Sequence, residues 1–245
     1  MNALSKPLLL VVLVSQAVFG QSTRFYENYG MGRAGTKDGT LRLQLAQGRT
    51  MTVRQDSAGR TYTLYYFSKK NQLVMMGTPY WTYPTWQAGT IQPEDHAPET
   101  PCQIAYNVAS NEVLCRFNND TTVYPLKPVT FTIGDARFVR QKPLGYTTYY
   151  RVLYKGDAEL LEGFKRPMTV LKPQPYGDAY LTGYFLSLEH YYYLKLPNGP
   201  LRSLELNRKS LLKAMGDNVD TKLLPPGDAL TVADVVRVLA DYDAH

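Results

Sequence analysis

Histidines and cysteines are the side chains best suited to chemistry near neutral pH, and this chain has few of them. The histidines are His96, His190 and His245, whose ordinary pKa lies closest to neutrality, and the cysteines are Cys102 and Cys115. A zinc site needs three or four such ligands close together, and neither cysteine has a close partner of this kind in the sequence. We therefore predict no metal site and no cofactor.

Two further motifs resemble sites and are better explained without one. Residues 30–35 read GMGRAG, but a dinucleotide-binding loop needs a strand before this motif and a helix after it, and neither pattern is present. His96 lies among carboxylates in a proline-rich loop, where a solvated acidic loop is a better account than a cation site. No serine nucleophile elbow, no paired-histidine zinc motif and no outstanding carboxylate pair occurs. The sequence therefore predicts no catalytic residue and favours a non-enzymatic protein, without deciding the matter.

The aromatic segment PYWTYPTW is the best binding candidate. It contains Tyr80, Trp81, Tyr83 and Trp86, which include both tryptophans of the chain, and prolines stiffen it. Aromatic faces on a rigid β scaffold stack on sugar rings or pack against a partner protein. The alternative is that they cover an open end of the β core, because large aromatic side chains are usually buried. We predict ligand or partner contact at these residues, with a glycan or an envelope protein as the candidate partners.

Cys102 and Cys115 are candidates for a disulfide bond. They lie on two expected strands that are joined by a turn near residues 109–112. With a four-residue loop, Cys115 faces Tyr106, and the two cysteines are then too far apart for a disulfide. A two-residue shift of the register brings them within diagonal reach. The sequence leaves both a disulfide and two buried free thiols open.

Alternating apolar and polar residues run from about residue 40 to residue 206, with turn residues between the runs. The chain also has 20 tyrosines, which suit a half-buried pleated surface. Beyond residue 206 the apolar spacing becomes helical, with Asn207 and Thr231 placed to cap two helices. These patterns predict a mainly β fold with α+β character. Antiparallel hairpins or a meander would form a sandwich or a partly open barrel, closed by two short C-terminal helices.

The stretch LEHYYYLKLPNGPLRSLEL contains three consecutive tyrosines after a histidine, and it predicts a hairpin. Asn-Gly is a strong hairpin turn signal, so YYYLKL and LRSLEL would be the paired strands. Neighbouring residues of a strand point to opposite faces. Tyr192 and His190 therefore share one face, Tyr191 and Tyr193 share the other, and His190 is expected to be half-buried and hydrogen-bonded.

The first twenty residues have the pattern of a secretory signal peptide. Lys6 precedes an apolar run at 7–14, which is too short to span a bilayer, and small residues stand before a cleavage point at Gln21. The expected organisation is a signal peptide over 1–20, a flexible segment over 21–39, an antiparallel β body over 40–206 with a candidate sub-boundary within the proline-rich segment 77–101, and a helical pair over 207–245 packed on the β body.

The charge pattern and the remaining apolar runs restrict the environment. Lys and Arg number 27 against 21 Asp and Glu, but no block of like charges occurs, so we predict no nucleic-acid partner. No other stretch is long and apolar enough for a membrane span, so the mature chain should be soluble and lack a transmembrane segment. The expected location is the periplasm, the cell surface or the extracellular space.

Three passages resemble a known family. They are IAYNVASNEVLCRF (104–117), VTFTIGDARFVR (129–140) with YYRVLYKGDAELLEGFKR (149–166), and YYYLKLPNGPLRSLELNRKSLLKAMGD (191–217). Together they look like a family of exported proteins of unknown function from Gram-negative bacteria. The resemblance covers roughly residues 77–245. It implies export and a similar topology, and it brings no activity and no catalytic residues.

From these observations we expect an exported soluble protein that acts as a non-enzymatic binding or envelope-associated interaction module. The alternative is a secreted hydrolase acting on envelope or environmental polysaccharide, with scattered carboxylates as its acid and base.

Overall fold

The computed structural model describes residues 50–244, except 67–71, 118–121, 145–146, 177–178 and 217–220. The expected signal peptide, the segment 21–39, the GMGRAG motif and His245 lie outside the described residues. The chain divides into two units, Met1–Met51 with Tyr65–Gln72 and Thr52–Leu64 with Leu73–His245. Nearly all described residues belong to the second unit, and the description below concerns that unit together with the strand-end residues 50–51, 65–66 and 72, which are counted with the first.

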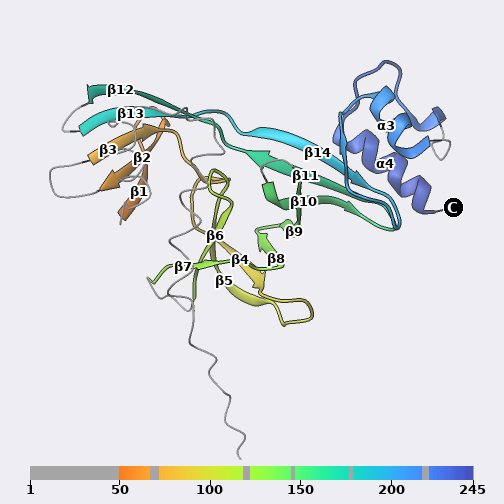
Figure 1. The fold of residues 1–245 in the computed structure, drawn as a ribbon, viewed down its shortest axis with the longest axis horizontal. Helices are drawn as coiled ribbons and strands as arrows, with labels where there is room; N and C mark the ends of the chain where they lie inside the picture. Colours follow the sequence, from red (N-terminus) through yellow and green to blue (C-terminus); the bar gives the residue numbers. More distant parts are fainter. Residues whose placement is uncertain are drawn as a thin grey trace, which may run out of the picture. The chain divides into compact units, whose positions relative to one another are not determined.

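The described chain is mainly β, with two sheets and two α-helices (Figure 1). The smaller sheet has the order β1 (Thr50–Gln55), β2 (Thr61–Tyr66), β3 (Gln72–Met76), β13 (Ala179–Phe185), β12 (Met168–Tyr176). The larger sheet has the order β15 (Arg202–Leu204), β14 (Glu189–Lys195), β11 (Glu159–Lys165), β10 (Thr147–Lys155), β9 (Ala136–Leu144), β8 (Thr130–Ile133), β4 (Gln87–Gln92), β5 (Thr100–Asn107), β6 (Glu112–Arg116), β7 (Tyr124–Leu126). Antiparallel pairs dominate both sheets, and two short helices follow them at the C-terminal end, so the predicted mainly β fold class is confirmed.

Most strands that follow one another in sequence also pair, as alternation with turn residues predicts. Three pairings join strands that do not follow one another in the sequence, and one of them is the antiparallel pair of β11 with β14. β3 pairs with β13 in parallel, so a strand near the start of the described chain joins one more than a hundred positions later. β4 pairs with β8, at Ile91↔Phe131 and Gln92↔Thr130. Turn signals report only which neighbouring segments fold back on each other, and for that reason they do not reveal these three contacts.

The close approach of β4 to β8 depends on a glycine. A Cβ atom on Gly89 would lie 1.9 Å from the backbone carbonyl oxygen of Thr132. On either side of this point the strands are joined by polar contacts, and the N–H of Thr90 donates to Oγ1 of Thr132 at 2.9 Å. Any residue other than glycine at position 89 would force the two strands apart.

The strands from β8 to β7 must curve. Four Cα steps join Leu126 at the end of β7 to Thr130 at the start of β8, and they span at most about 15 Å. Three strands, β4, β5 and β6, separate β7 from β8 in the sheet order, which in a flat sheet would place them about 19 Å apart. The short connection therefore pulls this half of the sheet into a curl, and the curl creates a concave inner face.

The inner face of the curl carries an aromatic core, which continues onto β9, β10 and β11. Its buried members are Ile91, Ile104, Tyr106, Val108, Val113, Cys115, Phe131, Ile133, Phe138, Tyr149 and Phe164. The rings of Phe131 and Phe138 stack with their centroids 4.6 Å apart. Tyr106 meets both rings edge to face, at 5.4 Å and 5.5 Å. A packed aromatic centre of this kind fixes the positions of the strand ends around it.

The C-terminal helices form a second core against the other end of the larger sheet (Figure 1). α3 spans Arg208–Met215, a short 3-10 turn spans Thr221–Leu223, and α4 spans Val232–Asp243. Asn207 caps α3 by accepting from the N–H of Ser210 at 2.7 Å, and Thr231 with Asp234 forms the predicted capping box of α4. Both predicted helices and both caps are confirmed. No helix in the described part of the chain has the length and apolar character needed to cross a membrane.

The predicted tyrosine hairpin is confirmed as β14 and β15. Tyr192 pairs with Leu204, and Asn198 adopts the positive φ of 56° that its turn requires. Tyr193 packs with Tyr150 on one face of the sheet at 5.1 Å between ring centroids, whereas Tyr192 belongs with the helical core on the other face. The three tyrosines therefore do not form one cluster, as the alternation predicts.

Candidate functional site

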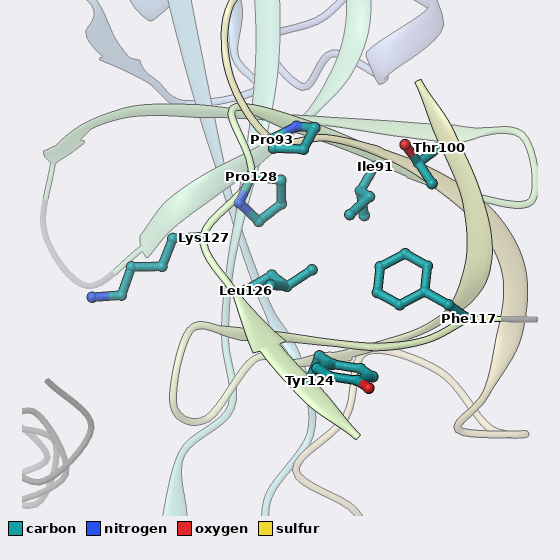
Figure 2. Close-up of a pocket in the computed structure, with 8 residues that line it drawn as sticks. All are labelled: Ile91, Pro93, Thr100, Phe117, Tyr124, Leu126, Lys127 and Pro128. Atoms are coloured by element: carbon teal, nitrogen blue, oxygen red, sulfur yellow. The ribbon is translucent and has the colours of Figure 1, made fainter. Parts of the chain in front are cut away.

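An apolar pocket opens at the end of the curled sheet (Figure 2). Its volume is about 320 Å³. The lining residues are Ile91, Pro93, Thr100, Phe117, Tyr124, Leu126, Lys127 and Pro128. They come from the end of β4 and the residue after it, the start of β5, the residue after β6, both ends of β7 and the residues that follow β7, so the curl itself assembles the pocket.

Strand alternation aims these side chains inward. Tyr124 and Leu126 of β7 lie opposite Cys115 and Val113 of β6, which belong to the buried core. Phe117 follows Cys115 by two positions and so continues the same face of the chain. Its ring lies 5.7 Å from that of Tyr124, tilted by 54°. The pocket is therefore an open extension of the aromatic core, and Ile91, Phe117 and Leu126 of its lining pack against that core.

The pocket offers apolar contact and little chemistry. Its lining includes no carboxylate, histidine or cysteine. Lys127 is its one ionisable group besides the phenol of Tyr124, and Figure 2 shows the ammonium end of Lys127 directed away from the other lining side chains. The remaining polar atom at the wall is the hydroxyl of Thr100. Such a lining can hold an apolar group by excluding water from it, and it supplies no acid–base pair.

Comparisons with protein families, curated proteins and solved structures give no match for this chain. The family resemblance in the sequence therefore stays a prediction. The function has to be argued from the geometry.

Two of the four predicted aromatic contact residues, Tyr80 and Trp81, pack into the protein. Tyr80 is 4% exposed, and burial raises the pKa of its hydroxyl. The Trp81 ring meets Phe138 edge to face at 5.0 Å and Phe164 at 6.0 Å. Its backbone N–H donates to the carbonyl of Tyr106 at 2.9 Å. For Tyr80 and Trp81, these contacts favour the alternative interpretation, in which the aromatic segment covers the core.

The other two predicted residues are more accessible. Tyr83 is 44% exposed. Trp86 is partly buried, and the guanidinium carbon of Arg116 lies 3.9 Å from its ring centroid. A sugar ring stacking on that face of Trp86 would have to displace Arg116, since a cation already covers it. Contact of Tyr83 and Trp86 with a ligand or partner stays a prediction.

The expected register of the cysteine hairpin was wrong by two residues. Cys115 faces Ile104 instead of Tyr106, because the loop holds residues 108–111. Cys102 and Cys115 are thus diagonal neighbours on the inner face, and both are free thiols. A hydrogen bond from Cys115 lowers the pKa of the Cys102 thiol, whereas that hydrogen bond and burial raise the pKa of Cys115. Whether they form a disulfide in the exported protein stays a prediction.

A buried carboxylate cluster crosses three strands of the larger sheet. The Glu162 side chain is 2% exposed, and its oxygens lie 2.5 Å from Nη2 of Arg151 and 2.7 Å from Nδ1 of His190. Arg151, Glu162 and Tyr192 are in register across β10, β11 and β14. Burial and the charge of Glu162 both raise the pKa of the Tyr192 hydroxyl. The expected hydrogen bond of His190 is confirmed, although 44% of its side chain is exposed.

Sequence reasoning missed the role of Glu162, although a signal was present. Residues 159–164 read ELLEGF, and strict alternation would place this second glutamate on the same face as Leu160 and Phe164. An acidic residue on a core-facing strand position needs a buried cation or hydrogen-bond donor beside it. The sequence could therefore predict that Glu162 has a cationic or hydrogen-bonding partner. Only the pairing of β10 with β11 shows that this partner is Arg151.

Sequence reasoning also missed the pocket. Tyr124 and Leu126 flank Pro125 in a short alternating run, which marks them as residues of one face. The other walls come from three separate segments, at 91–93, 100 and 117, and only the curl brings those segments together.

The loop around His96 was considered as a cation site and rejected. The described residues contain no group of three or more His, Cys, Asp and Glu side chains that could hold a metal ion.

Proposed function

We propose that this protein is an exported, non-enzymatic binding module that takes a small apolar group into the pocket of its curled sheet. The pocket is the observation that carries the proposal. Its volume of about 320 Å³ falls at the lower end of the usual range for ligand pockets, roughly 300–1,000 Å³. The apolar lining and the packed floor are properties of a site that holds a ligand without changing it.

A small molecule suits this pocket better than an added peptide strand. β7 lies at the edge of the sheet, where a partner strand would pair. Pro125 faces Leu114 of β6 and has no N–H, so it occupies a position whose backbone groups point away from β6. The outer edge of this three-residue strand therefore presents one carbonyl and no donor. Proline at an edge is a common device against strand addition.

Binding of 4-dimethylaminobenzonitrile, a small neutral one-ring dye whose fluorescence increases in apolar surroundings, tests the proposal. We expect saturable fluorescence enhancement with the full protein. Thr100→Phe places a ring inside the pocket and should abolish most of the enhancement. Val123→Ala is the matched control, because Val123 is an exposed apolar residue beside β7 that does not line the pocket. A saturable signal that is equal in all three proteins would contradict the proposal, provided that thermal melts show all three folded.

The hydrolase alternative has less support from the geometry. Glycoside hydrolysis needs two carboxyl groups that face a common substrate. Glu162 is engaged by Arg151 and His190. Glu189 pairs with Lys165, which is three positions after Glu162 on β11. Its side chain therefore lies on the face of the sheet opposite to that of Glu162. Release of reducing sugars from peptidoglycan or other envelope polysaccharide by the purified protein, lost in Glu162→Gln, would support the alternative over the binding module.

The export part of the proposal rests on the sequence and has its own test. Amino-terminal sequencing of the protein recovered from the periplasm or the medium should begin at Gln21. Recovery of the full-length chain from the cytoplasm alone would contradict export and would leave the binding proposal standing.

A further inference from the structure

The geometry points to the ligand class: we infer that the pocket accepts a neutral aromatic group of up to two fused rings. This inference rests on the proposed binding function. It goes further by choosing among aromatic, alkyl and sugar ligands, and between neutral and anionic ones.

The volume sets the size of the buried group. Water occupies about 30 Å³ per molecule in the liquid, and an apolar cavity of about 150 Å³ holds one benzene ring. The 320 Å³ of this pocket therefore corresponds to about ten non-hydrogen atoms, or two rings. A long acyl chain has more atoms than this volume holds, and Ile91 and Leu126, which line the pocket, are themselves packed against the core.

The aromatic walls favour a ring over an alkyl chain of the same size. Phe117 and Tyr124 line the pocket with their rings tilted by 54° to each other. A flat ligand ring can therefore meet one of them edge to face while it stacks on the other. Aromatic contacts of this kind add about 0.5–1.5 kcal/mol beyond burial, or about tenfold in affinity at the upper end. A sugar would lose hydrogen bonds to water that the single hydroxyls of Thr100 and Tyr124 cannot replace.

The charges around the mouth favour a neutral ligand. Pro93 lines the pocket and is followed directly by Glu94 and Asp95, both exposed. Glu99, on the other side of the same loop, precedes Thr100 and pairs with Arg137 at 3.2 Å. The ammonium of Lys127 is directed away from the other lining side chains (Figure 2). A carboxylate or sulfonate on the ligand would meet this acidic loop without a cation aimed at it.

Displacement of the same dye, 4-dimethylaminobenzonitrile, by four competitors provides the test. Naphthol and decanol have the same number of non-hydrogen atoms and differ in ring character, naphthoate adds a negative charge to the ring system, and glucose represents sugars. We expect naphthol to displace the dye at concentrations about tenfold lower than decanol does. Naphthoate should be weaker than naphthol, and glucose should not compete.

Two variants separate ring recognition from simple burial. Phe117→Leu and Tyr124→Leu keep an apolar wall and remove one ring each, so they should weaken naphthol binding about tenfold at most and leave decanol binding nearly unchanged. Equal or stronger binding of decanol in the natural protein would overturn the aromatic inference and leave the binding function standing. Tighter binding of naphthoate would overturn the neutral-ligand part. If the dye itself does not bind, the proposed function fails.

Discussion

The hydroxyl of Tyr154 on β10 donates a hydrogen bond of 2.6 Å to Oδ2 of Asp243, the last residue of α4. Oδ1 of the same carboxylate accepts from the backbone N–H of Ala158 at 3.1 Å. One side chain thus fastens the C-terminal helix to both sides of the β10–β11 hairpin. A negative charge at a helix C-terminus is unfavourable for the helix dipole, so these hydrogen bonds are what make the position acceptable.

Gly156, at the tip of that hairpin, should tolerate no side chain while Asp243 is present. A Cβ atom at this position would lie 1.8 Å from Oδ2 of Asp243. We expect Gly156→Ala to lower the free energy of unfolding by about 1–3 kcal/mol, measured by urea denaturation. In the Asp243→Ala background the same change should cost much less, because the obstructing side chain is gone. Additive effects of the two substitutions would contradict this contact.

The same contact predicts a loss of stability at alkaline pH. The hydrogen bond to Asp243, with smaller contributions from burial and from nearby carboxylates, raises the pKa of Tyr154 above its ordinary value. The protonated hydroxyl is therefore favoured in the folded state. Its contribution is fully present below the unfolded pKa of about 10 and is lost as the pH rises through the higher folded value. Thermal melts of the natural protein and Tyr154→Phe should converge above that pH, and a constant difference would argue against the contact.

The elements with local causes could be predicted from the sequence. The caps at Asn207 and Thr231 and the Asn-Gly turn of β14 and β15 act through neighbouring residues, and the structure has all of them. The parallel pairing of β3 with β13 and the curl from β8 to β7 were not predicted. They depend on segments far apart in the chain. Alternation shows on which face of a sheet a side chain lies, but it does not show which strand pairs with the one that carries it.

The candidate site follows the same division. Alternation placed Cys102 and Cys115 on one face, but the position of the loop sets the register. The loop lies one residue earlier than expected, which shifts the pairing of the two strands by two residues. The aromatic segment was identified by composition, which does not distinguish Trp81 in the core from Trp86 under Arg116. The pocket has walls from four segments of the chain, so no local pattern contains it.

Loss of Glu162 alone should destabilise the protein, whereas replacing Glu162 and Arg151 together by apolar residues should be tolerated. Glu162→Ala leaves Arg151 and His190 without their shared acceptor, and we expect a cost of about 3–5 kcal/mol in the free energy of unfolding. Replacing Glu162 with Leu together with Arg151→Met should recover most of that loss, because apolar pairs of similar volume often substitute for buried ion pairs. A double variant as unstable as Glu162→Ala would show that the charges are needed for another reason.

The two tryptophans should respond differently to truncation. Trp81→Ala removes a ring packed on Phe138 and Phe164, and we expect a loss of about 3 kcal/mol in denaturant unfolding. Trp86→Ala removes a partly buried ring in contact with Arg116 and should cost clearly less. Binding of a glycan array or an envelope extract by the natural protein, lost in a folded Trp86→Ala variant, would support ligand contact at this residue. Similar losses of stability in both variants would instead make Trp86 part of the core.

The cysteine pair is poised for oxidation beside the pocket. Cys102 and Cys115 share the inner face of β5 and β6, two positions from Thr100 and Phe117 respectively, which line the pocket. Diagonal residues on paired strands are about 7–8 Å apart, slightly beyond the usual disulfide range. A small movement of the strand ends should therefore suffice to form the bond.

Oxidised glutathione at a mildly alkaline pH should convert the two thiols to a disulfide. The thiols give up two protons and two electrons to the oxidant, and the intact mass falls by that of two hydrogen atoms. Closing a loop of this length is worth about 3 kcal/mol in an unstrained disulfide, so the diagonal geometry predicts a smaller gain in the melt. Cys102→Ser, which cannot form the bond, should show neither the mass change nor the gain. If the natural protein keeps its mass under conditions that oxidise an unfolded sample, the pair serves only to fill the core, as two free thiols would.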